Sequence, residues 1–373
     1  MASLAAPDAP HATPHATPPT MPAATPATAR SSPALTDAPD ASGPSSPVRA
    51  ARSLREIEAV VGDELGAFRE HFRHAMRSDV RLLDLVTRFV LRQKGKQMRP
   101  LLVLLCAKAA GGITEGTHRA AALVELLHTA TLVHDDVVDD AERRRGFYSV
   151  SALWKRKVAV LFGDFLLSRG LLLALDAKDY DTLHLLSDAI RRMSEGELLQ
   201  IEKTRHLDLD EPTYFRIISD KTASLISACT ASGARSAGAD DATVARMRAY
   251  GESLGLAFQI RDDLFDYGLD DVGKPLGIDV QEKKLTLPLI HALREATPGE
   301  RRDVLALVRK KSQTRADARR VADFAVERGG LDYARTRMRA LADDARSHAA
   351  GLPPSPAREA LIDLVTFAVE RRT

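Results

Sequence analysis

The sequence offers almost no sulfur for disulfides or for metal binding. Its 373 residues include only two cysteines, Cys106 and Cys229, and both lie in apolar stretches. This excludes the disulfide framework of small secreted domains and the cysteine spacing of zinc sites. We expect both to be buried structural thiols.

The chain also lacks a strong net charge and a long apolar run. It has 53 basic and 51 acidic residues, so its formal charge of +2 creates no overall field that would attract nucleic acid. No uninterrupted apolar run approaches the roughly 20 residues of a membrane span. We therefore expect a soluble, cytoplasmic protein without a transmembrane segment, in which any basic chemistry is local.

Aromatic residues and proline are unevenly distributed. Residues 1–52 hold eleven of the nineteen prolines, are rich in Ala, Thr and Ser, and contain no aromatic residue. Such a segment cannot bury enough apolar surface to offset the entropy of ordering, so we predict a disordered tail over 1–52. It has neither the compact apolar core of a signal peptide nor the many arginines of a transit peptide.

Residues 53–373 contain only eight prolines and no signals for β-hairpins. Apolar residues recur there at steps of three and four, for example in 54–72 and 80–93. Hydrophobic residues make up 45% of the chain, which is ample for a core. The sequence therefore predicts a single all-α domain over 53–373.

One apolar helical run, residues 123–140, ends in a cluster of aspartates. Helical periodicity places Asp135 and Asp139 on one face, with Asp136 roughly 100° round the helix. These carboxylates repel each other, and the helix dipole disfavours them at a C-terminal end. A Mg²⁺ ion that shares its ligands with substrate phosphates would resolve both conflicts. Alone, the pattern fits a solvated acidic helix end equally well.

A second copy of this DDxxD spacing follows the apolar run 251–260. It consists of Asp262, Asp263 and Asp266. Two apolar helices with such ends can face each other across a bundle and hold several divalent ions between them. Two unrelated acidic faces are the less favoured alternative.

The two motifs resemble the aspartate-rich signatures of the trans-isoprenyl diphosphate synthases, or polyprenyl synthetases, and the resemblance covers about residues 54–373. It implies an all-α bundle of the isoprenoid synthase type, with a central active-site cavity, that assembles as a homodimer. It also implies Mg²⁺ held by Asp135, Asp139 and Asp262, with Asp136, Asp263 and Asp266 in support.

A short basic segment precedes these motifs. Lys96 and Arg99 lie beside the start of a helix that Pro100 is expected to open, and fixed cations at a helix N-terminus favour anions. A solvated basic loop gives the same pattern. The segment resembles the family motif GGKRxRP, whose lysine and last arginine bind the diphosphate of isopentenyl diphosphate. Lys94 and Gln97 depart from that motif.

Two arginines follow Asp139 at the family spacing DDxxDxxxxRRG. Planar guanidinium groups bind phosphate oxygens in pairs, which suits a diphosphate ligand. By resemblance, Arg144 contacts the allylic diphosphate and Arg145 the isopentenyl one. His128 resembles the family histidine that helps to hold isopentenyl diphosphate, although a lone helical histidine is more often structural.

Lys221 and Thr222 resemble the family KT motif, whose lysine supports the departing pyrophosphate and whose threonine lies near the reacting carbons. Gln259, which follows Phe258, completes a string that resembles the family pattern FQxxDDxxD.

The glycine-containing segment after Asp266, up to Pro288, is a candidate lid. It resembles the family pattern GKxxGxDxxxGKxTLP, which places Lys274 and Lys284 as phosphate ligands. Residues 158–173 resemble the GDxLL helix that lines the hydrocarbon tunnel and helps to form the dimer, although alone they would read as core.

The resemblance implies Mg²⁺-dependent condensation of isopentenyl diphosphate with an allylic diphosphate such as farnesyl diphosphate, with release of pyrophosphate. In the family, a bulky aromatic residue four or five positions before the first aspartate closes the tunnel at short products. Ala130, about 7–8 Å from Asp135 along the helix, and Thr131 leave it open. We predict a long-chain synthase of the type that supplies quinone side chains, with possible transient membrane contact when product leaves.

Three alternatives remain. A terpene cyclase also ionises prenyl diphosphates with DDxxD, but it needs no second diphosphate site. A non-catalytic subunit of a heteromeric synthase typically loses aspartates, and here both motifs are intact. A di-iron bundle requires Glu-x-x-His pairs, and none flanks these motifs.

Overall fold

The computed structural model describes residues 52–93, 95, 97–144, 146–267, 284–310 and 312–370. These residues all belong to one compact unit, 50–373. The predicted disorder of the tail lies outside the described residues, except for its last residue. The predicted all-α class is confirmed.

The first half of the unit carries long helices and one small hairpin. Its elements are α1 (Leu54–Ala59), α2 (Gly62–Ala75), α3 (Arg81–Arg92), α4 (Met98–Ala110), α5 (Glu115–Val138), β1 (Arg143–Arg144), β2 (Phe147–Tyr148), α6 (Val150–Asp176) and α7 (Tyr180–His206). The strands pair antiparallel, with Arg144 opposite Phe147.

All the secondary-structure elements described in the second half are helical. Its elements are α8 (Glu211–Ile218), the π-helical turn η1 (Ser219–Ala223), α9 (Ser224–Ser236), α10 (Asp241–Phe265), α12 (Leu287–Arg294), α13 (Pro298–Arg309), α14 (Arg315–Glu327), α15 (Gly330–Ala350) and α16 (Pro356–Glu370).

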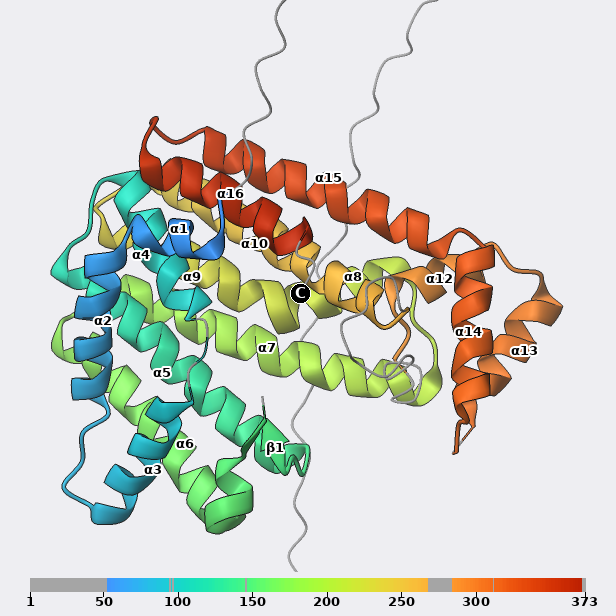
Figure 1. The fold of residues 1–373 in the computed structure, drawn as a ribbon, viewed down its shortest axis with the longest axis horizontal. Helices are drawn as coiled ribbons and strands as arrows, with labels where there is room; N and C mark the ends of the chain where they lie inside the picture. Colours follow the sequence, from blue (N-terminus) through green and yellow to red (C-terminus); the bar gives the residue numbers. More distant parts are fainter. Residues whose placement is uncertain are drawn as a thin grey trace, which may run out of the picture. The chain divides into compact units, whose positions relative to one another are not determined.

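The two helices that carry the aspartate motifs belong to the central layer of the unit. Helices α5, α7, α9 and α10 run across the middle of Figure 1, with α15 and α16 along one side and α2 and α6 on the other. Thr114 caps the start of α5, and Asp240 caps the start of α10 by accepting a hydrogen bond from the Thr243 N–H at 2.8 Å. Each helix then runs until its motif.

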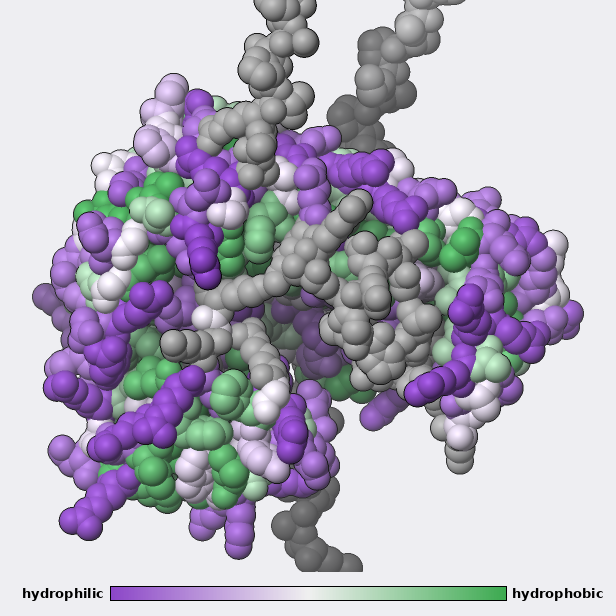
Figure 2. Space-filling view, in the orientation of Figure 1, coloured by the Kyte–Doolittle hydropathy of each residue, from purple (hydrophilic) through white to green (hydrophobic). Residues whose placement is uncertain are grey.

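Helix α6 is long and apolar enough to cross a membrane by length and composition, although charged residues interrupt its apolar run. Core helices of soluble proteins pass the same test, and α6 packs along α5, where Leu123 approaches Gly170. Only 33% of its most apolar window is buried, however. Apolar side chains gather at the lower left of Figure 2, where Figure 1 places α3, α5 and α6.

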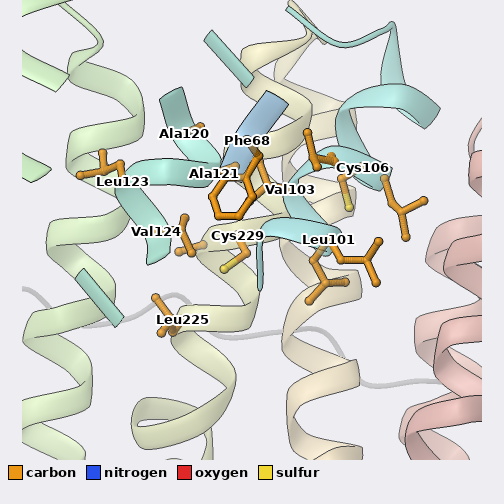
Figure 3. Close-up of a cluster of buried hydrophobic side chains, with 14 of the residues drawn as sticks. Phe68, Leu101, Val103, Cys106, Ala120, Ala121, Leu123, Val124, Leu225 and Cys229 are labelled. Atoms are coloured by element: carbon orange, nitrogen blue, oxygen red, sulfur yellow. The ribbon is translucent and has the colours of Figure 1, made fainter. Parts of the chain in front are cut away.

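Helix α4 is buried on all sides and forms the centre of the core. Figure 3 shows Val103 and Cys106 of α4 beside Phe68 of α2 and Cys229 of α9. Helix α9 approaches α4 closely because Gly233 has no side chain; a Cβ there would collide with the carbonyl oxygen of Val103. Close packing of this kind makes the core intolerant of added volume.

Both cysteines are free and buried, as predicted. Burial raises the pKa of the Cys229 thiol to about 12, so this side chain is not a nucleophile at neutral pH. The start of α4 differs slightly from the prediction, because the helix begins at Met98 rather than at Pro100. A proline fits anywhere in the first turn, where backbone N–H groups have no helical partner.

Candidate active site

A cavity of about 110 Å³ lies between α7, α8, η1 and α10. It brings together five residues that the sequence analysis selected from distant parts of the chain, and it adds polar groups from α7 and α8. The five are Lys221, Thr222, Gln259, Asp263 and Lys284; the added polar residues include Gln200, Lys203, Thr204 and Tyr214. We refer to it as the central cavity.

The π-helical turn η1 places Lys221 and Thr222 on the cavity wall. A π turn contains an extra residue, which changes the direction of its side chains, and such turns are frequent at functional sites. Here α7 passes close to the turn because it has Gly196 at the contact, where a Cβ would come within 2.9 Å of the Asp220 Cβ. Arg192 secures the turn by donating from Nε to Asp220 Oδ1 at 2.8 Å and from Nη2 to Ser219 Oγ at 2.7 Å.

The ammonium group of Lys221 is held by two residues of α7. Its Nζ lies 2.5 Å from Glu197 Oε2 and donates to Gln200 Oε1 at 3.2 Å. An ammonium group has three donors, so the lysine can also contact a ligand phosphate in the cavity.

Asp263, the middle carboxylate of the second motif, is occupied by protein contacts. Tyr214 donates its hydroxyl to Oδ2 at 2.7 Å, and Gln259 donates from Nε2 to Oδ1 at 3.0 Å. Thr222 in turn donates to Gln259 Oε1 at 2.8 Å. Asp263 is 5% exposed, whereas the side chain of its neighbour Asp262 is 41% exposed. The second motif therefore leaves Asp262 partly exposed, where it accepts a hydrogen bond from Arg261 Nη2 at 3.4 Å, and holds Asp263 in a hydrogen-bonded network.

The first motif shows the same division between neighbours. Asp136 is 5% exposed and accepts a hydrogen bond from Arg144 Nε at 2.6 Å. The β1–β2 hairpin positions this arginine, and its turn uses Gly146 with φ +83°. Asp135 and Asp139 are exposed. The first motif thus presents these two carboxylates and fixes Asp136.

The electrostatic surroundings of Asp135 connect the first motif to the central cavity. Loss of hydration raises the pKa of this carboxyl group even though its side chain is exposed, while Arg144 opposes the rise and Asp139 adds to it. Glu197 also raises the pKa and Lys221 lowers it, so both act on Asp135 directly. A cation placed beside Asp135 would relieve the desolvation and the repulsion between carboxylates.

The donor chemistry at the two motifs fits Mg²⁺, although no group of three or more His, Cys, Asp or Glu side chains within the described residues lies close enough to hold a metal alone. Mg²⁺ usually takes one or two carboxylates, keeps several waters and uses substrate phosphates for the rest of its shell. The carboxylates of Asp135 and Asp139, which are exposed, and of Asp262, which is partly exposed, are hard oxygen donors of this kind. Asp266, at the C-cap of α10, lies one turn beyond Asp262.

The remaining predicted site residues lie on the expected helices or outside the described part. Arg99 is in the first turn of α4, and His128 is half-buried on α5. Ala130 is 3% exposed, and Thr131 donates to the His128 carbonyl at 2.9 Å; neither residue lines the central cavity. Lys96, Arg145 and Lys274 lie outside the described residues, together with residues 268–283 of the candidate lid.

Sequence reasoning did not select Glu197, Gln200 or Tyr214, which contact the predicted residues. Glu197 and Gln200 are three residues apart on α7 beside Gly196, and a polar pair next to a helical glycine was the available signal. Tyr214 is 49 residues from Asp263, so no local pattern links the two.

The model of the polyprenyl synthetase family matches residues 80–324. The chain belongs to this family. It is 34% identical over 321 residues to the octaprenyl diphosphate synthase of Escherichia coli, an alignment that covers 86% of this chain and 99% of the relative. As a member of the family it is a prenyltransferase.

Two solved structures extend the likeness to the fold. The decaprenyl diphosphate synthase of Rhodobacter capsulatus superimposes with a TM-score of 0.81 at 36% identity, over 86% of this chain and all of the other. The polyprenyl synthase of Caulobacter crescentus, solved with calcium and isoprenyl diphosphate, gives a TM-score of 0.78 at 36% identity, over 87% of this chain and all of the other.

Proposed function

We propose that this family member is a long-chain polyprenyl diphosphate synthase. It would add isopentenyl diphosphate repeatedly to an allylic diphosphate, such as farnesyl diphosphate, and release pyrophosphate at each step. The observation that carries the proposal is the placement of Lys221, which lines the cavity beside Asp263 and acts electrostatically on Asp135. A single lysine is thereby shared by the surroundings of both aspartate motifs.

Mg²⁺ held by Asp135, Asp139 and Asp262 would supply Lewis-acid stabilisation of the diphosphate oxygens. Lys221, Lys284 and Arg144 add fixed positive charge where the departing pyrophosphate develops negative charge. Thr222 and Gln259 line the same wall, and Gln259 keeps Asp263 in place. Asp136, Asp263 and Asp266 support the ligand carboxylates. Lys96, Arg99, His128 and Arg145 would bind isopentenyl diphosphate, and Lys274 would contact phosphate from the candidate lid.

The product is proposed to be long because the relatives reported above are named for octaprenyl and decaprenyl products. The small residues Ala130 and Thr131 on α5 agree with this proposal, because an aromatic residue there would block a growing chain. Quinone side chains are the proposed destination of such a product.

Homodimer formation is proposed to use α6. Its exposed face carries Leu161, Leu172 and Leu175, which are 56%, 48% and 45% exposed. Several exposed leucines on one helix face are typical of an interface rather than of a free surface. With this face covered, we infer a cytoplasmic enzyme that contacts the membrane transiently when its product leaves.

The test is incubation of the purified full-length protein with Mg²⁺, labelled isopentenyl diphosphate and farnesyl diphosphate, with products sized by mass spectrometry after dephosphorylation. A ladder that ends at one long polyprenol supports the proposal. Consumption of farnesyl diphosphate without incorporation of label would replace it with a terpene cyclase. Absence of any turnover would favour a non-catalytic subunit of a heteromeric synthase.

A further inference from the structure

A second cavity, of about 530 Å³, opens at the other end of α5 from the aspartate motif. The last turns of α2, the first turns of α5 and the C-terminal half of α6 enclose it (Figure 1). Its lining residue Arg119 precedes Asp135 by sixteen positions, which corresponds to about 24 Å along the helix. No residue lines both this cavity and the central cavity, and no predicted site residue belongs to it.

The lining is strongly basic in a protein whose overall charge is close to zero. Four arginines and two histidines face two glutamates and three apolar residues; the arginines are Arg73, Arg77, Arg119 and Arg169. Both glutamates are already engaged. Glu70 pairs with Arg73 at 2.5 Å, and Glu115 lies 3.0 Å from His71 Nε2.

Three arginines of this cavity are left without close carboxylate partners among the described residues. Arg169 donates from Nε to the carbonyl oxygen of Ala75 at 2.7 Å, so its two terminal nitrogens remain available. The buried Nε of Arg119 forms a long ion pair with Asp179 Oδ2 at 3.9 Å, which is beyond hydrogen-bond range, so no hydrogen bond among the described residues holds this guanidinium group. Arg77 makes no ion pair in the described part and is exposed at the rim.

Several guanidinium groups around one concave space repel one another. An anion with several oxygens would remove this repulsion, because guanidinium groups bind phosphate oxygens in pairs. The volume lies in the range of small-molecule sites and exceeds the size of one phosphate group. Leu173, Ala75 and Ala122 give the cavity an apolar wall.

We propose that this cavity, which we call the arginine cavity, is a second anion site that binds a soluble diphosphate or triphosphate group, free or as an ester of a small organic group. Arg119 of α5 and Arg169 of α6 bind the phosphates inside the cavity, and the exposed Arg77 contacts them from its rim. The site is separate from the central cavity and does not depend on the aspartate motifs.

The experiment measures binding of inorganic pyrophosphate to the full-length protein in excess chelator, by calorimetry and by amide hydrogen exchange. The exchange measurement gives the location. We expect slower exchange in residues 70–77 and 115–122 at saturating pyrophosphate. Binding without protection of these two segments would contradict the proposal.

Three variants sharpen the measurement. Arg119→Gln should weaken this binding about tenfold, because it removes charged hydrogen bonds to the anion. Glu115→Gln should tighten it, since the amide keeps a hydrogen bond with His71 but no longer repels an anion. Arg320→Gln, an exposed residue of α14, should leave it unchanged. Thermal melts check that each variant folds. If Arg119→Gln does not fold, the increased pyrophosphate affinity expected for Glu115→Gln still tests the proposal.

A parallel flotation assay with phosphatidylglycerol vesicles separates a soluble ligand from a lipid headgroup. We expect pyrophosphate to bind whether or not vesicles are present. Equal pyrophosphate affinity in the native protein, Arg119→Gln and Glu115→Gln would overturn the assignment. Arg119-dependent vesicle binding without pyrophosphate binding would overturn it as well.

Discussion

The two aspartate motifs have the same spacing and end helices of similar length, but their surroundings differ. In the first motif, the buried Asp136 is paired with the cationic Arg144 from a hairpin. In the second, the buried Asp263 accepts hydrogen bonds from the neutral groups of Tyr214 and Gln259. Arg144 therefore brings a cationic partner to the middle carboxylate of the first motif, and Tyr214 and Gln259 bring neutral donors to that of the second.

The shared feature is as informative as the difference. In both motifs the first aspartate is accessible and the second is tied to the protein, so identical residues separate into ligand and support. We infer that both middle aspartates act by fixing the geometry of their motifs rather than as direct metal ligands.

The largest effect is expected from removal of the accessible carboxylates. Asp135→Asn and Asp262→Asn should each lower kcat at least about a hundredfold, because each removes electrostatic stabilisation of the departing diphosphate. The measurement is steady-state incorporation of labelled isopentenyl diphosphate. Asp140→Asn, one position beyond the first motif and paired with Arg156, is the control and should stay within about threefold. Near-normal turnover in Asp135→Asn would contradict the proposed metal site.

A smaller effect is expected from the supporting partners. Arg144→Gln should lower kcat/KM more than Tyr214→Phe does, because it removes a cation from both Asp136 and the diphosphate. Tyr214→Phe removes one hydrogen bond to a charged group, and a loss of about tenfold follows from the usual strength of such bonds. Both variants need a kinetic comparison over a range of Mg²⁺ concentrations. A larger loss in Tyr214→Phe would show that the hydrogen-bonded support matters more.

An alanine lies five positions before each motif, and substitution of each one by phenylalanine tests whether a product tunnel borders α5 but not α10. Both are buried: Ala130 is 3% exposed and Ala257 of α10 is 0% exposed. Ala130→Phe should shorten the product ladder with little loss of stability. Ala257→Phe should instead destabilise the fold by about 1–3 kcal/mol through overpacking. The measurements are product sizing and thermal melts of both variants. An unchanged product ladder together with a lowered Tm in Ala130→Phe would contradict the prediction that a product tunnel borders α5.

The smallest effect concerns stability without metal. The pKa of Asp135 is raised in the folded protein, so ionisation of this group destabilises the native state, and the cost is fully present above the folded pKa. Asp135→Asn should therefore melt at a higher temperature than the native protein at pH 7 in chelator. The difference should shrink as pH falls through the folded pKa toward the unfolded value. A lower Tm at pH 7 would contradict this assignment.

Much of this arrangement follows from local sequence patterns. The helical period indicated that Asp135 and Asp139 share a face, and the second DDxxD copy indicated a facing partner. The sequence did not indicate which carboxylates are buried, because Asp136 and Asp263 are tied by Arg144 and by Tyr214, the latter 49 residues away. Such pairs depend on tertiary packing rather than on spacing.

Contacts on the wall of the central cavity could not be predicted from the sequence for the same reason. Lys221 was selected as part of a short motif, but its partner Glu197 belongs to the preceding long helix. Only the crossing of α7 over η1, which Gly196 permits, brings the two together. Residue propensity gives no signal for a π turn, since the same residues can also form an ordinary α-helix.

The most direct test of the division between ligand and support is a count of bound Mn²⁺ by electron paramagnetic resonance in the presence of inorganic pyrophosphate. Asp135→Asn and Asp262→Asn should each reduce the number of tightly bound ions. Asp136→Asn and Asp263→Asn should keep the number but weaken the binding. Loss of an ion in Asp263→Asn as complete as in Asp262→Asn, or retention of every ion in Asp135→Asn, would contradict the account.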